Sequence, residues 1–319
     1  MLQVGVLVQN FGAFPETGRS SRACIDLAVH AERAGFDSVW VTDHIVLPYA
    51  REARYPHNDS GSFPYAWHQD IHDPIVLLGA LAQATERVVL GVSVLVIPYR
   101  HPLTTAKMLA TVDQLSEGRL VLGAGVGWLR DEFAALGLGD DLFAHRGSVT
   151  DEYLEVIRAA WTVDGPVSHE GPFVRFGRVG TYPKPARRPH PPIWVGGKGD
   201  RALRRAVSLG DGYLAISSGP AQLAHEVTRL RELATHASRD PETLTVALID
   251  GIVVTERPLG RDRSPLHGTP EQILDGLHEY ARAGLAHLVA GVRPADDPTF
   301  AGAVDALDAV ASLLAEDRR

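Results

Sequence analysis

The sequence predicts an α/β protein built as a (β/α)8 barrel, or TIM barrel. Apolar strand patterns alternate with helical patterns along the chain, roughly eight times, as such a barrel requires. Several strands end in runs of small residues, such as Gly123-Ala124-Gly125-Val126-Gly127. No low-complexity tract or linker divides the 319 residues, so a single domain over residues 1–319 is expected.

Residue spacing and terminating residues define each element in order. The first strand is expected at 4–9, and an amphipathic helix follows at 20–34 and stops at Gly35. Thr269-Pro270-Glu271-Gln272 starts a later helix with a capping box and an early proline, and Gly284 ends it. By the same criteria the other strands are expected at 36–41, 87–94, 119–122, 193–195, 212–216, 244–254 and 285–290, and the other helices at 74–84, 103–115, 130–136, 148–161, 200–209, 221–236 and 300–314.

Two stretches interrupt this alternation. Residues 162–191 are rich in glycine and proline, and they predict a surface insertion between the fourth helix and the fifth strand. Residues 45–73 follow the second strand and contain several tyrosines, tryptophans and histidines. Long loops on barrels commonly cover the binding site, so this segment is the expected substrate lid.

Composition excludes several classes of protein. The net charge of −8 argues against binding to nucleic acid or to a membrane surface. Cys24 is the only cysteine, which excludes an intrachain disulfide and a cysteine-rich metal site. The histidines of 45–73 match no ligand spacing, so no metal is expected. The chain start does not resemble a signal peptide and no apolar run is long enough to span a bilayer, so a cytoplasmic location is expected.

Asp43 and His44 directly follow the second strand, at the expected mouth of the barrel, where such folds bind ligands. Imidazole changes its charge near neutral pH and can exchange a proton with a bound molecule. The pair is therefore the candidate catalytic pair. Its position is also compatible with a histidine that only caps a loop.

Small residues at two further strand ends indicate a binding floor for a flat ligand. Ser93 and Val94 end the third strand, and the glycine series 123–127 follows the fourth. The series lacks the acidic residue of dinucleotide-binding folds, so tight turns remain an alternative. Trp128 comes directly after it and, with Tyr65 and Trp67 of the lid, is a candidate for the substrate wall.

The fifth strand leads into Gly196-Gly197-Lys198-Gly199, which opens a helix that carries Arg201. Glycines at a helix start leave backbone N–H groups free for an anion, and Lys198 and Arg201 add positive charge. A phosphate or an acidic tail is expected here. A solvated basic helix face is the alternative.

Six ordered motifs resemble those of the luciferase-like flavin and deazaflavin oxidoreductases. They are VWVTDH, LGVSVLVIPYRHP, QLSEGRLVLGAGVGWLRDEF, DEYLEVIRAAW, PIWVGGKGDRALRRAVSLGDGYLA and HGTPEQILDGLHEYARAGLAHLV. The likeness runs from residue 3 to about 292, and LGAGVGWLRDEF is most similar to the branch that depends on the deazaflavin coenzyme F420.

The resemblance implies specific positions in the site. It implies a non-prolyl cis peptide at Ser93-Val94 under the cofactor ring, with Asp43 and His44 beside that ring. The backbone of Gly125-Val126-Gly127 would follow the cofactor's polar chain, and Gly196 and Gly197 would hold its phosphate. His44 is then the expected proton donor or acceptor. The resemblance also implies a homodimer.

We therefore expect an F420-dependent oxidoreductase that transfers a hydride to or from a small organic substrate. Lys198, Arg201, Lys184, Arg187 and Arg188 favour an open basic groove for the acidic tail of F420. An FMN-dependent monooxygenase that uses O2 is the alternative, and a non-catalytic flavin-binding barrel is a third possibility.

Two positions argue against one substrate class. Sugar-phosphate dehydrogenases of the superfamily carry a tryptophan after the Asp-His pair and a glutamate after the glycines, where this chain has Pro48 and Trp128. Oxidation of a sugar phosphate is therefore not expected.

Overall fold

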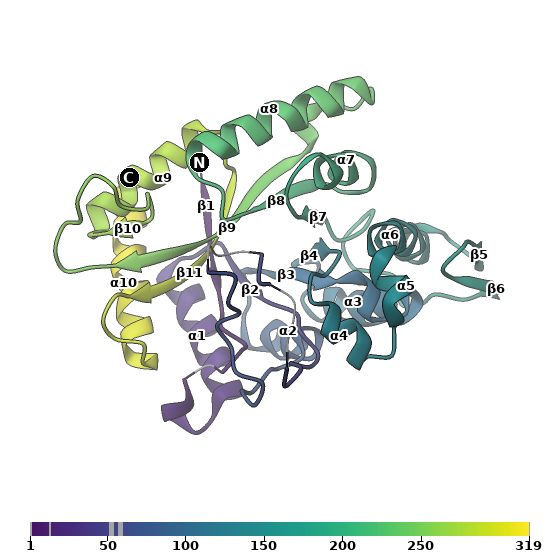
Figure 1. Ribbon diagram of the computed structural model, residues 1–319, viewed down its shortest axis with the longest axis horizontal. Helices are drawn as coiled ribbons and strands as arrows, with labels where there is room; N and C mark the ends of the chain where they lie inside the picture. The colour runs from purple at the N-terminus through teal and green to yellow at the C-terminus, as the bar shows by residue number, and fades with distance from the viewer. Residues whose placement is uncertain (1, 13, 51–53, 57–59, 319) are drawn as a thin grey trace.

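The structure, a computed structural model, describes residues 2–12, 14–50, 54–56 and 60–318. Within these residues, parallel strands close into the predicted barrel, and helices lie around it (Figure 1). The strands follow one another around the barrel in chain order, and the last pairs with the first. The barrel strands are β1 Gln3–Leu7, β2 Ser38–Val41, β3 Val89–Val96, β4 Leu120–Gly125, β7 Ile193–Gly196, β8 Gly212–Ile216, β9 Thr245–Val254 and β11 His287–Pro294.

The helices bury one face against the barrel, as their sequence periodicity predicts. Leu78 of α2 and Leu109 of α3, for example, are fully buried between the helices and the strands. The long helices are α1 Ser20–Ala34, α2 Pro74–Ala84, α3 Pro102–Leu115, α6 Arg146–Thr162, α7 Asp200–Leu209, α8 Pro220–His236, α9 Pro270–Arg282 and α10 Phe300–Asp317. Short helices are α4 Arg130–Ala135 and α5 Gly139–Ala144, with 3-10 turns η1 Pro15–Thr17, η2 Ile97–Tyr99 and η3 Pro241–Thr243.

The structure differs from the sequence prediction at three places. The short helix α5 was not expected, because GDDLFA has no helical apolar pattern. Residues 162–191 connect α6 to β7, and they contain an antiparallel pair, β5 Val167–Glu170 and β6 Arg175–Val179, at one end of the molecule (Figure 1). A further short strand, β10 His267–Gly268, pairs with β9.

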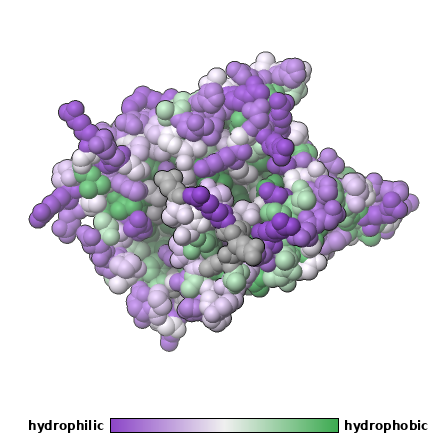
Figure 2. Space-filling model, viewed as in Figure 1, coloured by the Kyte–Doolittle hydropathy of each residue, from purple (hydrophilic) through white to green (hydrophobic). Residues whose placement is uncertain are grey.

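Hydrophilic residues cover much of the face in Figure 2, and hydrophobic residues show between them in separate patches. In the described part of the chain, no helix has both the length and the apolarity needed to cross a membrane.

Inside the barrel, aromatic rings pack against a buried polar group. The rings of Trp40 and Trp194 stack with their centroids 5.2 Å apart. The Ser38 hydroxyl accepts a hydrogen bond from Trp40 Nε1 and lies 2.7 Å from Nε2 of His287. Burial lowers the pKa of His287 to about 4, so the imidazole is neutral in the folded protein at neutral pH. Opposite Trp40, Gly91 leaves room for the indole ring, because a Cβ there would lie 2.1 Å from it.

The contact between Gly91 and Trp40 predicts a stability change. We expect Gly91→Ala to destabilise the protein by about 1–3 kcal/mol, because the added methyl overpacks the barrel interior. Gly79 is the matched control, since it lies in α2 and a Cβ there meets nothing within 4 Å. Gly79→Ala should instead stabilise by about 0.5–1 kcal/mol. Urea denaturation of both variants measures the difference, and equal effects would contradict the packing argument.

Neutral His287 predicts a loss of stability in acid. The unfolded chain takes up a proton at this histidine near its ordinary pKa of about 6.5, whereas the folded protein does so only near pH 4. The contribution of His287, about 3 kcal/mol at most, is therefore full above about pH 6.5 and is lost as the pH falls toward 4. Urea denaturation between these pH values should show a smaller decline in His287→Gln, and an unchanged decline would exclude His287 as its source.

Candidate active site

The carboxyl ends of the barrel strands open into a cavity of about 590 Å³. This volume lies in the range of small-molecule and cofactor sites. Most of the residues predicted for the site line this cavity, namely Asp43, His44, Tyr65, Ser93, Val94, Gly125, Val126, Gly127, Trp128, Gly196 and Gly197. The strand ends that the sequence marked as binding candidates thus line a single cavity.

Four predicted site residues do not line the cavity. Gly123 lies within β4, where a Cβ would be 2.1 Å from the Val92 carbonyl oxygen, so this glycine allows close approach of β3 and β4. The expected glycine loop therefore starts only after Gly125. Trp67 is half exposed and packs against Tyr49 on the lid surface. Lys198 and Arg201 are exposed at the start of α7.

Three further basic residues that were expected near the acidic tail of the cofactor do not line the cavity. Lys184 is buried, and its Nζ donates to the carbonyl oxygen of Ala160. The Arg187 N–H donates to Asp113 near the end of α3, which leads into the amino end of β4. Lys184 and Arg187 therefore belong to the opposite end of the barrel, and Arg188 follows Arg187 directly in the chain. The expectation of a basic groove from these three residues was wrong, because the segment 162–191 returns to the amino end before β7 begins.

Asp43 forms a buried ion pair at the end of β2. Arg100 donates two hydrogen bonds to its carboxylate, at 2.8 and 2.9 Å, and the Val96 N–H donates a third at 2.9 Å. Burial raises the pKa of the Asp43 carboxyl, and the Arg100 guanidinium opposes that rise. Arg100 also binds Asp73, the N-cap of α2. Both carboxylate oxygens of Asp43 accept hydrogen bonds, and these bonds fix the ends of β2 and β3 relative to each other.

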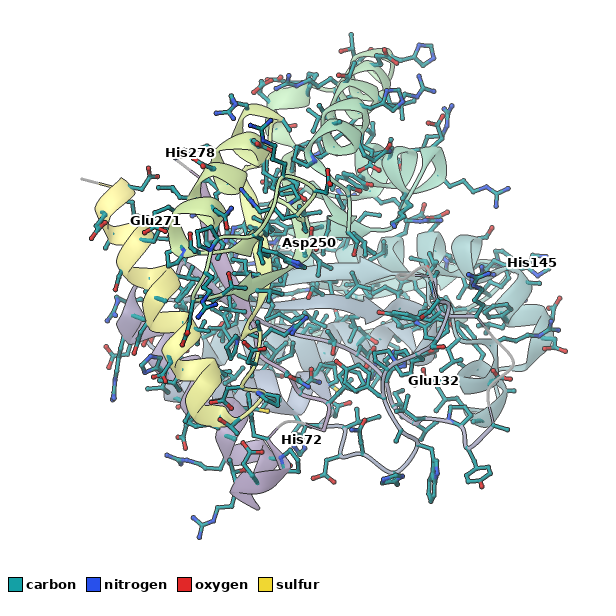
Figure 3. All side chains as sticks on the ribbon, turned by 60° about the vertical axis from the view of Figure 1, so that its left-hand side comes forward. His72, Glu132, His145, Asp250, Glu271 and His278 are labelled. Carbon is teal, nitrogen blue, oxygen red and sulfur yellow. The ribbon has the colours of Figure 1, made fainter. Side chains whose placement is uncertain are left out.

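His44, the next residue, is held by Glu132 of α4. Nδ1 of His44 lies 2.6 Å from Oε2 of Glu132. The Glu132 side chain is fully buried and also accepts hydrogen bonds from the N–H groups of Ile45 and Val46 and from the Tyr99 hydroxyl. Figure 3 shows Glu132 toward the interior of the molecule, whereas His145 of the same region lies at its edge. His44 therefore has one ring nitrogen occupied, and its ring borders the cavity.

Aromatic rings surround His44 on the cavity side. Phe11, Phe63 and Trp128 lie 5.3 to 6.2 Å from the imidazole, measured between ring centroids. Tyr55 and Tyr65 contact these rings in turn, and burial raises the pKa of both phenols, which keeps them neutral. We call Phe11, Tyr55, Phe63, Tyr65 and Trp128 the aromatic enclosure. It leaves only 11% of the His44 side chain exposed.

Asn10 anchors both ends of the segment that supplies three of these rings. Its side chain, fully buried, exchanges hydrogen bonds with the backbone of Thr42 and donates one to the carbonyl oxygen of His72. The segment 45–73 therefore leaves and rejoins the barrel at fixed points. The described part of this segment lies over the cavity through Tyr55, Phe63 and Tyr65, while Arg51 and His57 lie outside the described residues.

The floor of the cavity lies at a bulge in β3. The Ser93-Val94 peptide is cis, as the family resemblance implies, and the pairing of β3 with β4 shifts register there. A Cβ on Gly125 or on Gly196 would lie 2.2 or 2.5 Å from the methyl groups of Val94. Both glycines thus make room for the Val94 side chain, which faces the cavity. The Ser93 hydroxyl is buried and has no hydrogen-bond partner among the described residues.

Glu132, Tyr99, Arg100 and Asn10 were not predicted from the sequence. Glu132 follows the glycine series by five positions, so inspection of the position directly after the glycines finds Trp128 instead. The contact between His44 and Glu132 spans 88 residues and depends on β2 and β4 ending at the same edge of the barrel. An acidic residue in the first turn of the helix that follows β4 was the available signal.

The ion pair between Asp43 and Arg100 predicts a large stability effect. We expect Asp43→Asn to cost about 3–5 kcal/mol, because it leaves a buried guanidinium with weaker compensation. Asp73→Asn is the control, since Asp73 binds the same guanidinium from a partly exposed position and asparagine also caps helices. It should cost at most about 1 kcal/mol. Urea denaturation separates the two variants, and comparable losses would show that burial of the pair is unimportant.

Comparisons with known proteins show the family of this chain. Residues 2–259 match the model of the family described as luciferase-like monooxygenase. An uncharacterized protein of Mycobacterium tuberculosis (strain ATCC 25618 / H37Rv) is 34% identical over 220 residues, 68% of this chain and 76% of that protein. An F420-dependent glucose-6-phosphate dehydrogenase of Amycolatopsis mediterranei (strain U-32) is 32% identical over 197 residues, 61% of this chain and 54% of that enzyme.

Solved structures share the fold over the whole chain. The monooxygenase RslO1 from Streptomyces bottropensis has a TM-score of 0.80 at 23% identity and covers 100% of both chains. An F420-dependent secondary alcohol dehydrogenase in complex with an F420-acetone adduct has a TM-score of 0.79 at 19% identity, covering 98% of this chain and 99% of that one. The family match and these relatives confirm the resemblance seen in the sequence motifs: this protein belongs to the luciferase-like monooxygenase family.

Proposed function

We propose that this protein is an F420-dependent oxidoreductase that interconverts a small, apolar alcohol and its carbonyl compound. The observation that carries the proposal is His44, held by a buried carboxylate inside the aromatic enclosure, beside the Ser93-Val94 floor. The relatives named as F420-dependent glucose-6-phosphate dehydrogenases, one of them 32% identical, support F420 as the cofactor.

The residues present fit a flat cofactor ring on the cavity floor. The unpartnered Ser93 hydroxyl is a buried polar group that a bound ligand can satisfy, and buried polar groups normally have such partners. Val94 would support the face of the ring, and the backbone of Gly127 and Gly197 would follow its polar chain. Lys198 and Arg201, at the start of α7, are our proposed contacts for the phosphate and the acidic tail.

The protein's own part in the reaction is orientation and proton transfer. When bound, a deazaflavin accepts or supplies a hydride. His44 takes the hydroxyl proton of the alcohol as the carbonyl forms, and it returns that proton in the reverse direction. Asp43 keeps the strand ends in place but carries no proton in this scheme, because its oxygens are committed to Arg100 and Val96. The aromatic enclosure keeps bulk water away from the transfer.

The lining of the cavity favours an uncharged substrate. Arg293 is the only lysine or arginine among the described residues that line it, and the enclosure beside His44 consists of aromatic rings. A sugar phosphate would place its doubly charged group in an environment with little positive charge. We therefore propose neutral secondary alcohols or ketones as the substrate class, with residues 45–73 as the lid over them.

The proposal predicts a cofactor preference. Titration of the purified protein with F420, and separately with FMN, should give a dissociation constant near 1 µM for F420 and a value at least about tenfold higher for FMN. Fluorescence of the cofactor provides the signal. The opposite preference would indicate an FMN-dependent monooxygenase, and binding of neither would show that the cavity floor is not a cofactor site.

The role of His44 predicts a loss of turnover without a loss of binding. With F420 bound, a panel that includes propan-2-ol, cyclohexanol and glucose 6-phosphate should show reduction of F420 by the neutral alcohols only. His44→Ala should lower this turnover by about 10²-fold or more and keep its affinity for F420. His72→Ala is the control, because the His72 ring contacts Ser20 outside the cavity lining. F420 binding without any turnover would instead support a non-catalytic flavin-binding barrel.

A further inference from the structure

We propose that Glu132 is a positioning residue that fixes the tautomer of His44. Its carboxylate holds the proton on Nδ1, so Nε2 is the nitrogen that exchanges a proton with the substrate. The proposal rests on the proposed function for the identity of the reaction. The state of the histidine can nevertheless be measured without cofactor or substrate.

The hydrogen-bond partners of Glu132 favour an ionised carboxylate. Oε1 faces the N–H groups of Ile45 and Val46, at 2.7 and 3.2 Å, and backbone N–H groups can only donate. Oε2 accepts from the Tyr99 hydroxyl at 2.9 Å, and burial together with Glu132 raises the pKa of Tyr99, so that its proton stays on the phenol. With three donors in place, an ionised carboxylate is fully satisfied when His44 supplies the fourth from Nδ1.

A proton on Nδ1 determines what His44 offers to the cavity. A neutral imidazole carries one N–H, so Nε2 then has a free lone pair that can accept a substrate proton. The buried carboxylate beside Nδ1 stabilises the imidazolium that results, as the acidic member of a catalytic triad does. Without Glu132, either nitrogen could carry the proton, and the ring could rotate.

The same carboxylate also fixes the chain around His44. Ile45 and Val46 are the first residues of the lid segment, and their N–H groups bind the oxygen that does not face His44. One fully buried side chain therefore sets both the orientation of the imidazole and the direction in which the chain leaves β2. Such support keeps a reacting group within a narrow range of positions.

A second buried carboxylate that faces a histidine provides a matched control. Glu152 of α6 lies 3.2 Å from Nε2 of His169 and accepts hydrogen bonds from the N–H groups of Phe173 and Val174. This pair repeats the contacts of Glu132, with two backbone donors and one imidazole, but it does not line the cavity. A change at Glu152 tests the cost of losing a buried carboxylate without touching the candidate site.

Nitrogen NMR of the ¹⁵N-histidine-labelled full-length protein tests the proposal directly. At about pH 8 an ordinary histidine is neutral, and the ring nitrogen shifts report which nitrogen carries the proton. His44→Gln identifies the His44 signals among the 14 histidines. We expect the proton of His44 on Nδ1 in the wild-type protein. A proton on Nε2 in the wild type would overturn the proposal, and this result needs no variant of Glu132.

Glu132→Gln should move the proton. Ile45 and Val46 keep the amide oxygen of the glutamine on their side, so its NH2 group points to His44 and donates to Nδ1. The histidine proton then moves to Nε2, a change visible in the same spectra. Glu152→Gln should leave the His44 signals unchanged. An unaltered tautomer in a folded Glu132→Gln protein would contradict the proposal.

Kinetic measurements then distinguish a Glu132 that positions His44 from a Glu132 that only supports the chain at Ile45 and Val46. With F420 and whichever of propan-2-ol or cyclohexanol is oxidised, Glu132→Gln should lower kcat by about 10²-fold, while KM and the F420 affinity stay within about twofold. Glu152→Gln should leave all three values unchanged. Equal losses in kcat and F420 affinity would show that Glu132 only holds the loop. If the wild-type protein binds no F420, the proposed function fails, and the NMR result alone decides the role of Glu132.

Discussion

The active end of the barrel depends on the buried ion pair between Asp43 and Arg100. Asp43 ends β2, and Arg100 follows the 3-10 turn after β3 and reaches on to Asp73 at the start of α2. One guanidinium therefore joins the two strand ends to the helix between them. His44 is next to Asp43, and Ser93-Val94 lies just before Val96, whose N–H binds Asp43. The distance from His44 to the cavity floor is thus set largely by this pair.

Asp43 and Glu132 are two neighbouring buried carboxylates, and their hydrogen-bond partners differ in whether they can exchange a proton. Asp43 faces a guanidinium that stays charged, and its remaining hydrogen bond is to a backbone N–H, so it has no proton to exchange. Glu132 faces neutral donors and an imidazole, a group that can gain and lose a proton near neutral pH. The first carboxylate holds the strands together, whereas the second, in our proposal, fixes the tautomer of the neighbouring His44. The residue types of the partners, more than burial, produce this division.

The sequence predicted most of the fold and the cavity floor, but few of the contacts that hold the site. Strand and helix order follows from local periodicity, and a barrel places all strand ends at one edge, so His44, Val94 and Gly127 could be assigned to a common site. Glu132 could not be assigned, since its contact with His44 joins residues 88 positions apart. Lys184 was assigned to the wrong end because the path of 162–191 depends on tertiary contacts that no local pattern encodes.

The glycines of the floor also have a different role from the one their spacing indicates. Spaced glycines at strand ends predict close approach of a ligand to the backbone. Here Gly125 and Gly196 instead accommodate the two methyl groups of Val94, which stands between them and borders the cavity. A ring bound on this floor would rest on an aliphatic side chain, with the aromatic enclosure opposite. Mostly apolar side chains therefore border the cavity beside Val94, and under the proposed function a low dielectric there would strengthen the interaction between Glu132 and a protonated His44.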